Sequence, residues 1–120
     1  MVVLSAADGK ILETLPIGMG TDGAVFNPAT MEAFSSQGDG TMTVVKENSP
    51  TSFVVEQTVT TLPRAKTLTL DTKTNKIFLI TAEYGAVPAP ASGAAAPAAG
   101  GRPTRAPMVP DSFTILVVGK

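Results

Sequence analysis

The chain has 120 residues and a net charge of −1, from nine Lys or Arg and ten Asp or Glu residues. This length allows one domain with its own core, and the balanced charge gives neither the basic surface of a nucleic-acid-binding protein nor an acidic tail. The absence of Cys and His excludes a disulfide framework and thiolate metal ligands, and it removes the commonest general base.

About nine short runs rich in Val, Ile, Phe, Thr and Leu recur along the chain and predict β-strands. Turn signals such as Asp-Gly, Asn-Pro and Gly-Asp-Gly separate them, and no segment has a sustained helical period. Two runs, at 77–80 and 113–118, are apolar at consecutive positions, which indicates strands covered on both faces. The fold class is therefore all-β. We expect strands at 2–6, 11–16, 23–27, 31–37, 41–47, 53–60, 65–71, 76–82 and 112–118.

Part of this pattern occurs twice, at an offset of about 44 residues. A period of about 40–45 residues with four strands per period is the spacing of a β-propeller blade. We therefore predict a single β-repeat domain over 1–120 with about two blades of four antiparallel strands, at about 11–60 and 61–120. The matched segments are 11–15 with 54–59 after a one-residue slip, 26–34 with 70–78, and 41–45 with 112–117 after an insertion is set aside.

The insertion covers residues 86–110 and consists mainly of Ala, Pro and Gly. Its prolines are incompatible with the interior of a helix or strand, and it has no periodicity. This composition predicts a flexible or polyproline-like loop. The alternative is that Arg102 and Arg105 contact an anionic partner.

Three marks occur in a fixed order: "GKILETLPIG" leading into a strand, the Asn27-Pro28 turn that follows it, and the strand "DGTMTVV". In this order and spacing the chain resembles YVTN-type β-propeller repeats, in particular the last two blades of bacterial members with an Ala/Pro-rich loop before the final strand. The resemblance covers nearly the whole chain. It implies a scaffold fold, usually a ring of about seven blades, in proteins often exported to the periplasm or cell surface. Some relatives are thought to bind DNA or other macromolecules, and no catalytic motif accompanies the repeat.

Two blades are fewer than the four to eight that a propeller ring needs. A two-blade chain leaves apolar faces and strand edges open. We expect completion by oligomerisation or strand exchange, with two to four chains closing a ring and the strands at 2–6 and 11–16 pairing with the last blade of the same or another chain. The alternatives are a piece of a longer propeller and a compact two-sheet packing.

The Gly38-Asp39-Gly40 turn is the first candidate site, because an acidic residue recurs at Glu83 in the second copy. Such recurrence can indicate a metal or ligand rim. A tight turn, however, also favours Gly for its positive φ and Asp for a side chain that caps the turn. A Ca²⁺ loop needs several oxygen ligands, and this segment offers one carboxylate. We interpret Asp39 as a turn residue and expect no metal or other cofactor.

Three further sets of side chains have a chemical and a structural interpretation. An acid, base and nucleophile for hydrolysis could come from the carboxylates and serines, but no His or Cys is present to activate a serine, and nothing pairs two acids across a cleft. The basic residues are explained by solvated strand ends and turns, and the methionines by turns and core filling. The sets are Asp22, Asp39, Asp71, Glu83, Ser35 and Ser36; Arg64, Lys66, Lys73 and Lys76 with Tyr84; and Met1, Met19, Met31, Met42 and Met108.

The predicted function is that of a non-enzymatic binding or structural module whose ligand the sequence does not name. The alternative is a carboxylate- or metal-dependent hydrolase or lyase on the same scaffold. We expect self-association, no nucleic-acid partner and no membrane insertion, because the apolar runs are far shorter than the ~20 residues of a membrane helix. The first ten residues lack a basic n-region. The expected location is the cytoplasm for a complete gene product, or the periplasm or cell surface for the tail of an exported propeller.

Overall fold

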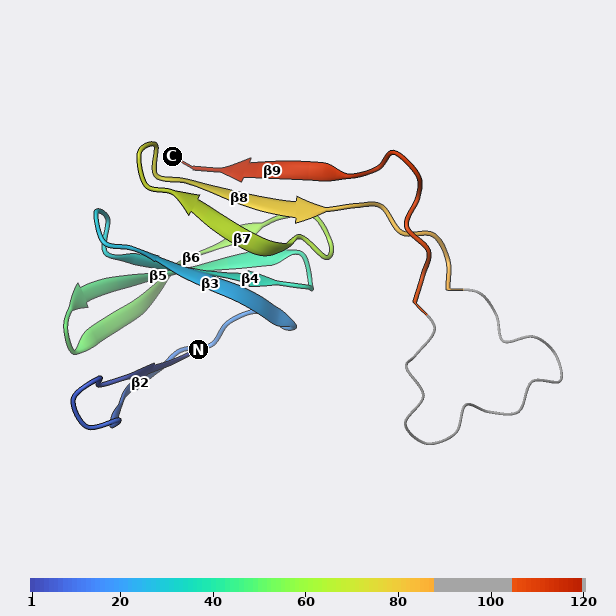
Figure 1. Ribbon diagram of the computed structural model, residues 1–120. Helices are drawn as coiled ribbons and strands as arrows, with labels where there is room; N and C mark the ends of the chain where they lie inside the picture. Colours follow the sequence, from blue (N-terminus) through green and yellow to red (C-terminus); the bar gives the residue numbers. More distant parts are fainter. Residues whose placement is uncertain (88–104, 120) are drawn as a thin grey trace, which may run out of the picture. The chain divides into compact units, whose positions relative to one another are not determined.

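The computed structural model describes residues 1–87 and 105–119, and this part of the chain contains nine strands and no helix (Figure 1). Accordingly, no helix within these residues is long and apolar enough to cross a membrane. The all-β fold class is confirmed, and each predicted strand is present within two residues at either end. The strands are β1 (Val2–Leu4), β2 (Ile11–Thr14), β3 (Thr21–Asn27), β4 (Glu32–Gln37), β5 (Thr41–Ser49), β6 (Ser52–Thr60), β7 (Lys66–Asp71), β8 (Lys76–Thr81) and β9 (Thr114–Val118).

The chain divides into two compact units, of which the larger comprises Met1–Thr81 with Thr114–Lys120 and the smaller Ala82–Phe113. All nine strands belong to the larger unit, where they form three antiparallel sheets. The N-terminal sheet contains β1 and β2, the central sheet has the order β3-β4-β5-β6, and the C-terminal sheet has the order β7-β8-β9. The N-terminal strands pair with each other, so the described residues do not have the predicted pairing of these strands with the last blade of the same chain.

The central and C-terminal sheets share one pattern of strand pairing. Phe34 of β4 lies opposite Val44 of β5, and Phe78 of β8 lies opposite Val117 of β9. A shift of one residue between paired strands would turn every side chain to the other face of the sheet. The two sheets have the same register, so corresponding residues lie on corresponding faces. The residues opposite the two phenylalanines on the first strands are Val25 and Thr69.

The turns that join the first two strands of each sheet are also alike. The backbone N–H of Ala29 donates to Asn27 Oδ1, and that of Lys73 donates to Asp71 Oδ1, at 3.0 Å in both turns. The residue before the second strand is left-handed in each turn, with φ 54° at Met31 and 56° at Asn75. Asn adopts this conformation readily and Met rarely does, so the shared geometry of the hairpin overrides local preference at Met31.

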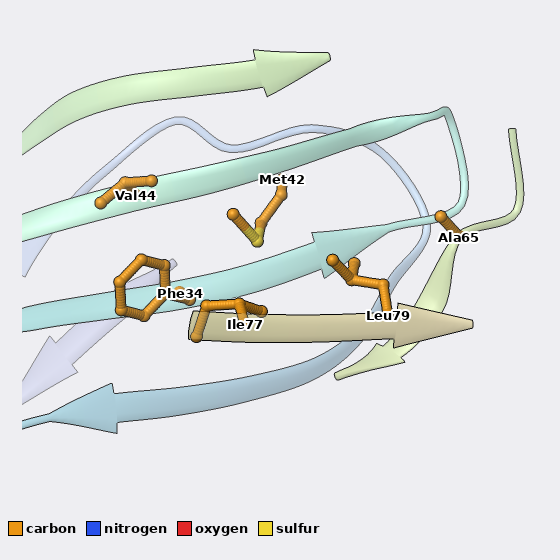
Figure 2. Packing of buried hydrophobic residues seen from close by; sticks show 6 residues of the cluster. All are labelled: Phe34, Met42, Val44, Ala65, Ile77 and Leu79. Atoms are coloured by element: carbon orange, nitrogen blue, oxygen red, sulfur yellow. The ribbon is translucent and has the colours of Figure 1, made fainter. Parts of the chain in front are cut away.

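The main core lies between the central and C-terminal sheets (Figure 2). Phe34, Met42 and Val44 project from β4 and β5 towards Ile77 and Leu79 of β8. Side chains alternate between the faces of a strand, so these residues come from one face of each sheet. Burying a side chain of this kind stabilises the fold by about 1.5–3 kcal/mol. Ala65 completes the buried cluster, and Val25, Val59, Leu68, Leu70, Leu116 and Val118 pack around it.

The opposite face of the central sheet carries the N-terminal sheet. Val45 follows Val44 along β5 and therefore points away from the main core. It lines a hollow with Phe26 and Phe53 of the central sheet and with Met1 and Val3 from the N-terminal end of the chain. The three sheets of the larger unit are thus layered in chain order, with the central sheet in the middle. This stack has one layer more than the compact two-sheet packing considered from the sequence.

The smaller unit holds the two ends of the Ala/Pro/Gly-rich insertion together. Tyr84 and Met108 form an antiparallel bridge, the Gly85 N–H donates to Pro107 O at 2.9 Å, and the Val109 N–H donates to Glu83 O at 2.9 Å. Most of the predicted loop at 86–110 lies outside the described residues. At its C-terminal end, residues 107–109 pair with residues 83–85.

Candidate functional site

Asp39 lies in the turn between β4 and β5, where its carboxylate receives three hydrogen bonds from nearby groups. The Met19 N–H donates to Oδ2 at 2.6 Å, while the N–H and the hydroxyl of Thr41 donate to Oδ1 at 3.0 and 2.6 Å. Gly40 follows with φ 89°, a conformation that disfavours any residue with a Cβ. Both carboxylate oxygens are therefore engaged in closing the turn and in fastening the 15–20 segment to it.

The pKa of Asp39 is lowered from its ordinary value, first by the Thr41 hydroxyl and then by the Met19 backbone N–H. These donors favour the ionised form of the carboxylate. Within the described residues no group of three or more acidic side chains could hold a metal. Asp39 thus has the chemistry of a turn residue, as the sequence indicated.

Replacing Asp39 with Asn should weaken the fold at neutral pH, because an amide offers one acceptor oxygen where the carboxylate offers two. The folded-state pKa is lowered, so the carboxylate stabilises the fold above its unfolded value of 3.8 and this contribution is lost as pH falls through the lower folded value. The difference in urea midpoint between the unsubstituted chain and Asp39→Asn should therefore be largest at neutral pH and shrink below pH 3.8. Glu83→Gln is the control, since no described residue bonds to its carboxylate, and an equal effect of both variants would contradict this role for Asp39.

Glu83, the counterpart of Asp39 in the repeat, belongs to the smaller unit. Its backbone N–H donates to Ser112 Oγ at 3.0 Å, and its backbone carbonyl accepts from the Val109 N–H. The role of Glu83 among the described residues is thus carried by its main chain. Neither unit contains both acids, so the predicted recurrence at Asp39 and Glu83 does not assemble a ligand rim within either unit.

Asp22 and Asp71 likewise bind neighbouring backbone and hydroxyl groups. Asp22 Oδ2 accepts from both the N–H and the hydroxyl of Thr67, at 2.9 and 3.0 Å, and so ties β3 to β7. Asp71 Oδ2 accepts from the Thr74 hydroxyl at 2.6 Å, which together with the Lys73 N–H lowers the pKa of Asp71. These two carboxylates fix strand and turn geometry.

Ser35 and Ser36 are fully buried in β4 and therefore cannot reach a substrate in this structure. Beside them Gln37, also fully buried, accepts through Oε1 from the hydroxyls of Thr41 and Thr43 at 3.2 and 3.3 Å. The hydroxyls of both serines and the Gln37 amide nitrogen have no hydrogen-bond partner among the described residues. The sequence did not indicate that this polar run would be buried, because Ser and Gln are mostly exposed in folded proteins.

The basic residues do not gather on one surface. Arg64 lies in the turn before β7 and Lys66 is the first residue of β7, whereas Lys73 lies in the turn after β7 and Lys76 begins β8. The six residues of β7 span about 17 Å, so the two pairs lie at opposite ends of the strand. Tyr84 belongs to the smaller unit, Arg105 is exposed, and Arg102 lies outside the described residues.

The methionines are divided among core, turns and surface, which agrees with their interpretation as structural residues. Met42 is 1% exposed in the main core, while Met1 lines the hollow beneath the N-terminal sheet. Met31 occupies a left-handed turn position, Met108 is bridged to Tyr84, and Met19 is exposed.

The outer side of the C-terminal sheet is an apolar surface that the sequence did not single out. Phe78, Ile80, Ile115 and Val117 share the face of this sheet that points away from the main core, and we call these four residues the C-terminal face. Ile115 and Val117 are 57% and 55% exposed. The predicted covering of both faces of these strands thus applies to one face only within the described residues.

A groove opens along the edge of the same sheet. In the central sheet β6 lies outside β5, whereas in the C-terminal sheet no described strand lies outside β9. The groove has a volume of about 480 Å³, lies between the two sheets and is lined by β4, β5, β6, β8, the turn before β8 and the end of β9. Its lining residues include Glu56, Gln57, Val59, Asn75, Ile77 and Val118.

The N-terminal sheet also has an outer apolar side. Val2 lies opposite Thr14 and Leu4 opposite Ile11, whereas Val3 points inward to the hollow beneath the sheet. We call Val2, Leu4 and Ile11, which are all more than half exposed, the N-terminal face. The larger unit therefore ends in an apolar surface at each end of its stack of sheets.

Comparison of the chain with protein-family models, with curated proteins and with solved structures finds no match.

Proposed function

We propose that this chain is a non-enzymatic binding or structural module of the β-propeller type, built from about two blades and completed by self-association. The proposed binding role does not rest on the acidic side chains of Asp22, Asp39 and Asp71, since these serve turns and strand junctions. The repeated register of the central and C-terminal sheets supports blade-like repeats, as does the recurrence of the same turn geometry. The resemblance to YVTN-type repeats points in the same direction.

The exposure of the C-terminal face is the observation that carries this proposal. Through the shared register, Met42 corresponds to Ile115 and Val44 to Val117. Within the central sheet these positions are 1% and 6% exposed, because the C-terminal sheet covers them, whereas their counterparts are more than half exposed. An apolar sheet face beside an open strand edge is typical of an interaction surface.

The solution mass tests the proposal directly. Light scattering on the full chain should give a multiple of the 12.3 kDa protomer mass, because association removes the C-terminal face from water. The mass should fall towards the protomer on dilution, as mass action requires. A constant 12.3 kDa over the whole accessible concentration range would contradict self-association.

A further inference from the structure

We infer that the partner of the C-terminal face is the N-terminal face of a second copy of this chain, so that copies associate head to tail. This inference rests on the proposed function and names the partner that the function leaves unspecified. It follows from the order in which the sheets are layered within one chain.

The contact between the central and C-terminal sheets shows which sides of two consecutive sheets meet. The central sheet contributes the side that carries Phe34, Met42 and Val44. The C-terminal sheet, which follows it in the sequence, contributes the side that faces the preceding sheet. The C-terminal face is the counterpart of the first of these sides, since Phe78 matches Phe34 and Val117 matches Val44. The surface that would cover the C-terminal face is therefore the side of a sheet that, within one chain, faces the preceding sheet.

The N-terminal face is a side of this kind. Val3 points towards the central sheet, so Val2 and Leu4 point away from it. They lie on the side of the N-terminal sheet that would face a preceding sheet. β1 and β2 are followed by the first strand of the next sheet, as β5 and β6 are, so they correspond to the third and fourth strands of a four-stranded sheet. One chain thus carries both halves of the contact that it uses internally.

The chemistry of the two faces agrees with this pairing. Leu4 and Ile11 on one face, and Ile115 and Val117 on the other, are large apolar side chains with more than half of their surface exposed. Threonine lies opposite Val2 on the first face and opposite Phe78 on the second, so both centres are uncharged. Apolar centres with few charges are typical of the buried core of a protein interface.

The two faces are different surfaces, so the contact is heterologous. A heterologous contact closes into a ring if the rotation between copies allows it and otherwise produces an open chain of copies. It also permits a complementation test, because each face can be blocked separately. A symmetric contact between two C-terminal faces would respond differently to the same variants.

The test uses Ile115→Lys to block the C-terminal face and Leu4→Lys to block the N-terminal face, both in the full chain. A lysine ammonium in an apolar contact has no partner for its charge, so each variant alone should have the 12.3 kDa mass of the protomer. An equimolar mixture should contain a dimer of twice that mass, since each variant retains the face that the other lacks. Met19→Lys, at an exposed methionine outside both faces, should assemble like the unsubstituted chain.

The set of outcomes distinguishes failure of the inference alone from failure of the proposed function. An unsubstituted chain that stays monomeric overturns both. Assembly that persists in Leu4→Lys alone indicates a symmetric contact and overturns only the head-to-tail inference, as does a mixture that stays monomeric. Circular dichroism checks that each variant keeps its β-structure, and if a lysine variant unfolds, Ile115→Thr and Leu4→Thr repeat the experiment with residues that strands accept.

Discussion

Leu79→Ala is expected to lower the free energy of unfolding by about 2–5 kcal/mol, the range for removing a large aliphatic side chain from a packed core. Leu79 has no exposed surface and lies on β8 within the cluster between the central and C-terminal sheets (Figure 2). Its removal leaves a cavity that strands on both sides can fill only in part. Urea denaturation at a fixed chain concentration measures the loss, because association adds a term that depends on concentration.

Leu62→Ala is the matched control, since it deletes the same atoms from a residue that is 45% exposed. Its expected loss is below about 1 kcal/mol. Equal losses at the two positions would mean that the contact between the two sheets contributes little to stability, contrary to the packing described above.

The strands could be predicted because their signals are local. Alternating or continuous apolar residues between Gly, Pro, Asn and Asp mark each strand, and the boundaries differ from the structure by at most two residues. The repeat also predicted that 26–34 and 70–78 form the same kind of hairpin. The two hairpins have the same register, and the side chains of Asn27 and Asp71 accept matching hydrogen bonds in their turns. The local sequence does not indicate the left-handed conformation of Met31, since Met has no preference for it, whereas Asn75 at the corresponding position does.

The third strand of each repeat was matched less well. The sequence aligned 41–45 with 112–117, whereas the pairing of Met42 with Ser36 and of Ile115 with Ile80 makes Thr41 correspond to Thr114. The residues that form the insertion separate β8 from β9, so no fixed offset connects the two repeats there. A shift of two residues leaves each side chain on the same face, which is why the predicted pattern of apolar residues survived the error.

The candidate sites also combine features set by neighbouring residues with contacts between residues far apart in the sequence. The capping of its turn by Asp39 and the positive φ of Gly40 follow from local residue preferences. The hydrogen bond from the Met19 N–H to Asp39 joins positions twenty residues apart, which no local signal indicates. The sequence did not indicate the exposed faces. Continuous apolar residues in 77–80 and 113–118 predict that both faces of these strands are buried, but they do not indicate whether the same chain or another chain buries each face. Only the layering of the sheets distinguishes the covered side from the open one.

Phe34→Ala and Phe78→Ala delete the same side chain from corresponding positions of the two sheets, and they should have opposite effects on stability and assembly. Phe34 is 8% exposed between the sheets, so its removal should cost about 3–5 kcal/mol in the free energy of unfolding. Phe78 is half-buried on the C-terminal face, so its removal should cost the single chain much less and should weaken association instead. Urea denaturation in the Ile115→Lys background, where association is blocked, measures the first effect, and light scattering without that background measures the second.

Two results would contradict this division. A loss of stability at Phe78 equal to that at Phe34, measured in the dissociated background, would mean that residues of the same chain already cover the C-terminal face. An unchanged mass of the Phe78→Ala assembly on dilution would mean that association uses another surface. If both expectations hold, the side chain at one position of the repeat packs in the core in the central sheet and in the contact between chains in the C-terminal sheet. The reason is that a stack of similar sheets exposes at its ends the same surfaces that it buries in its interior.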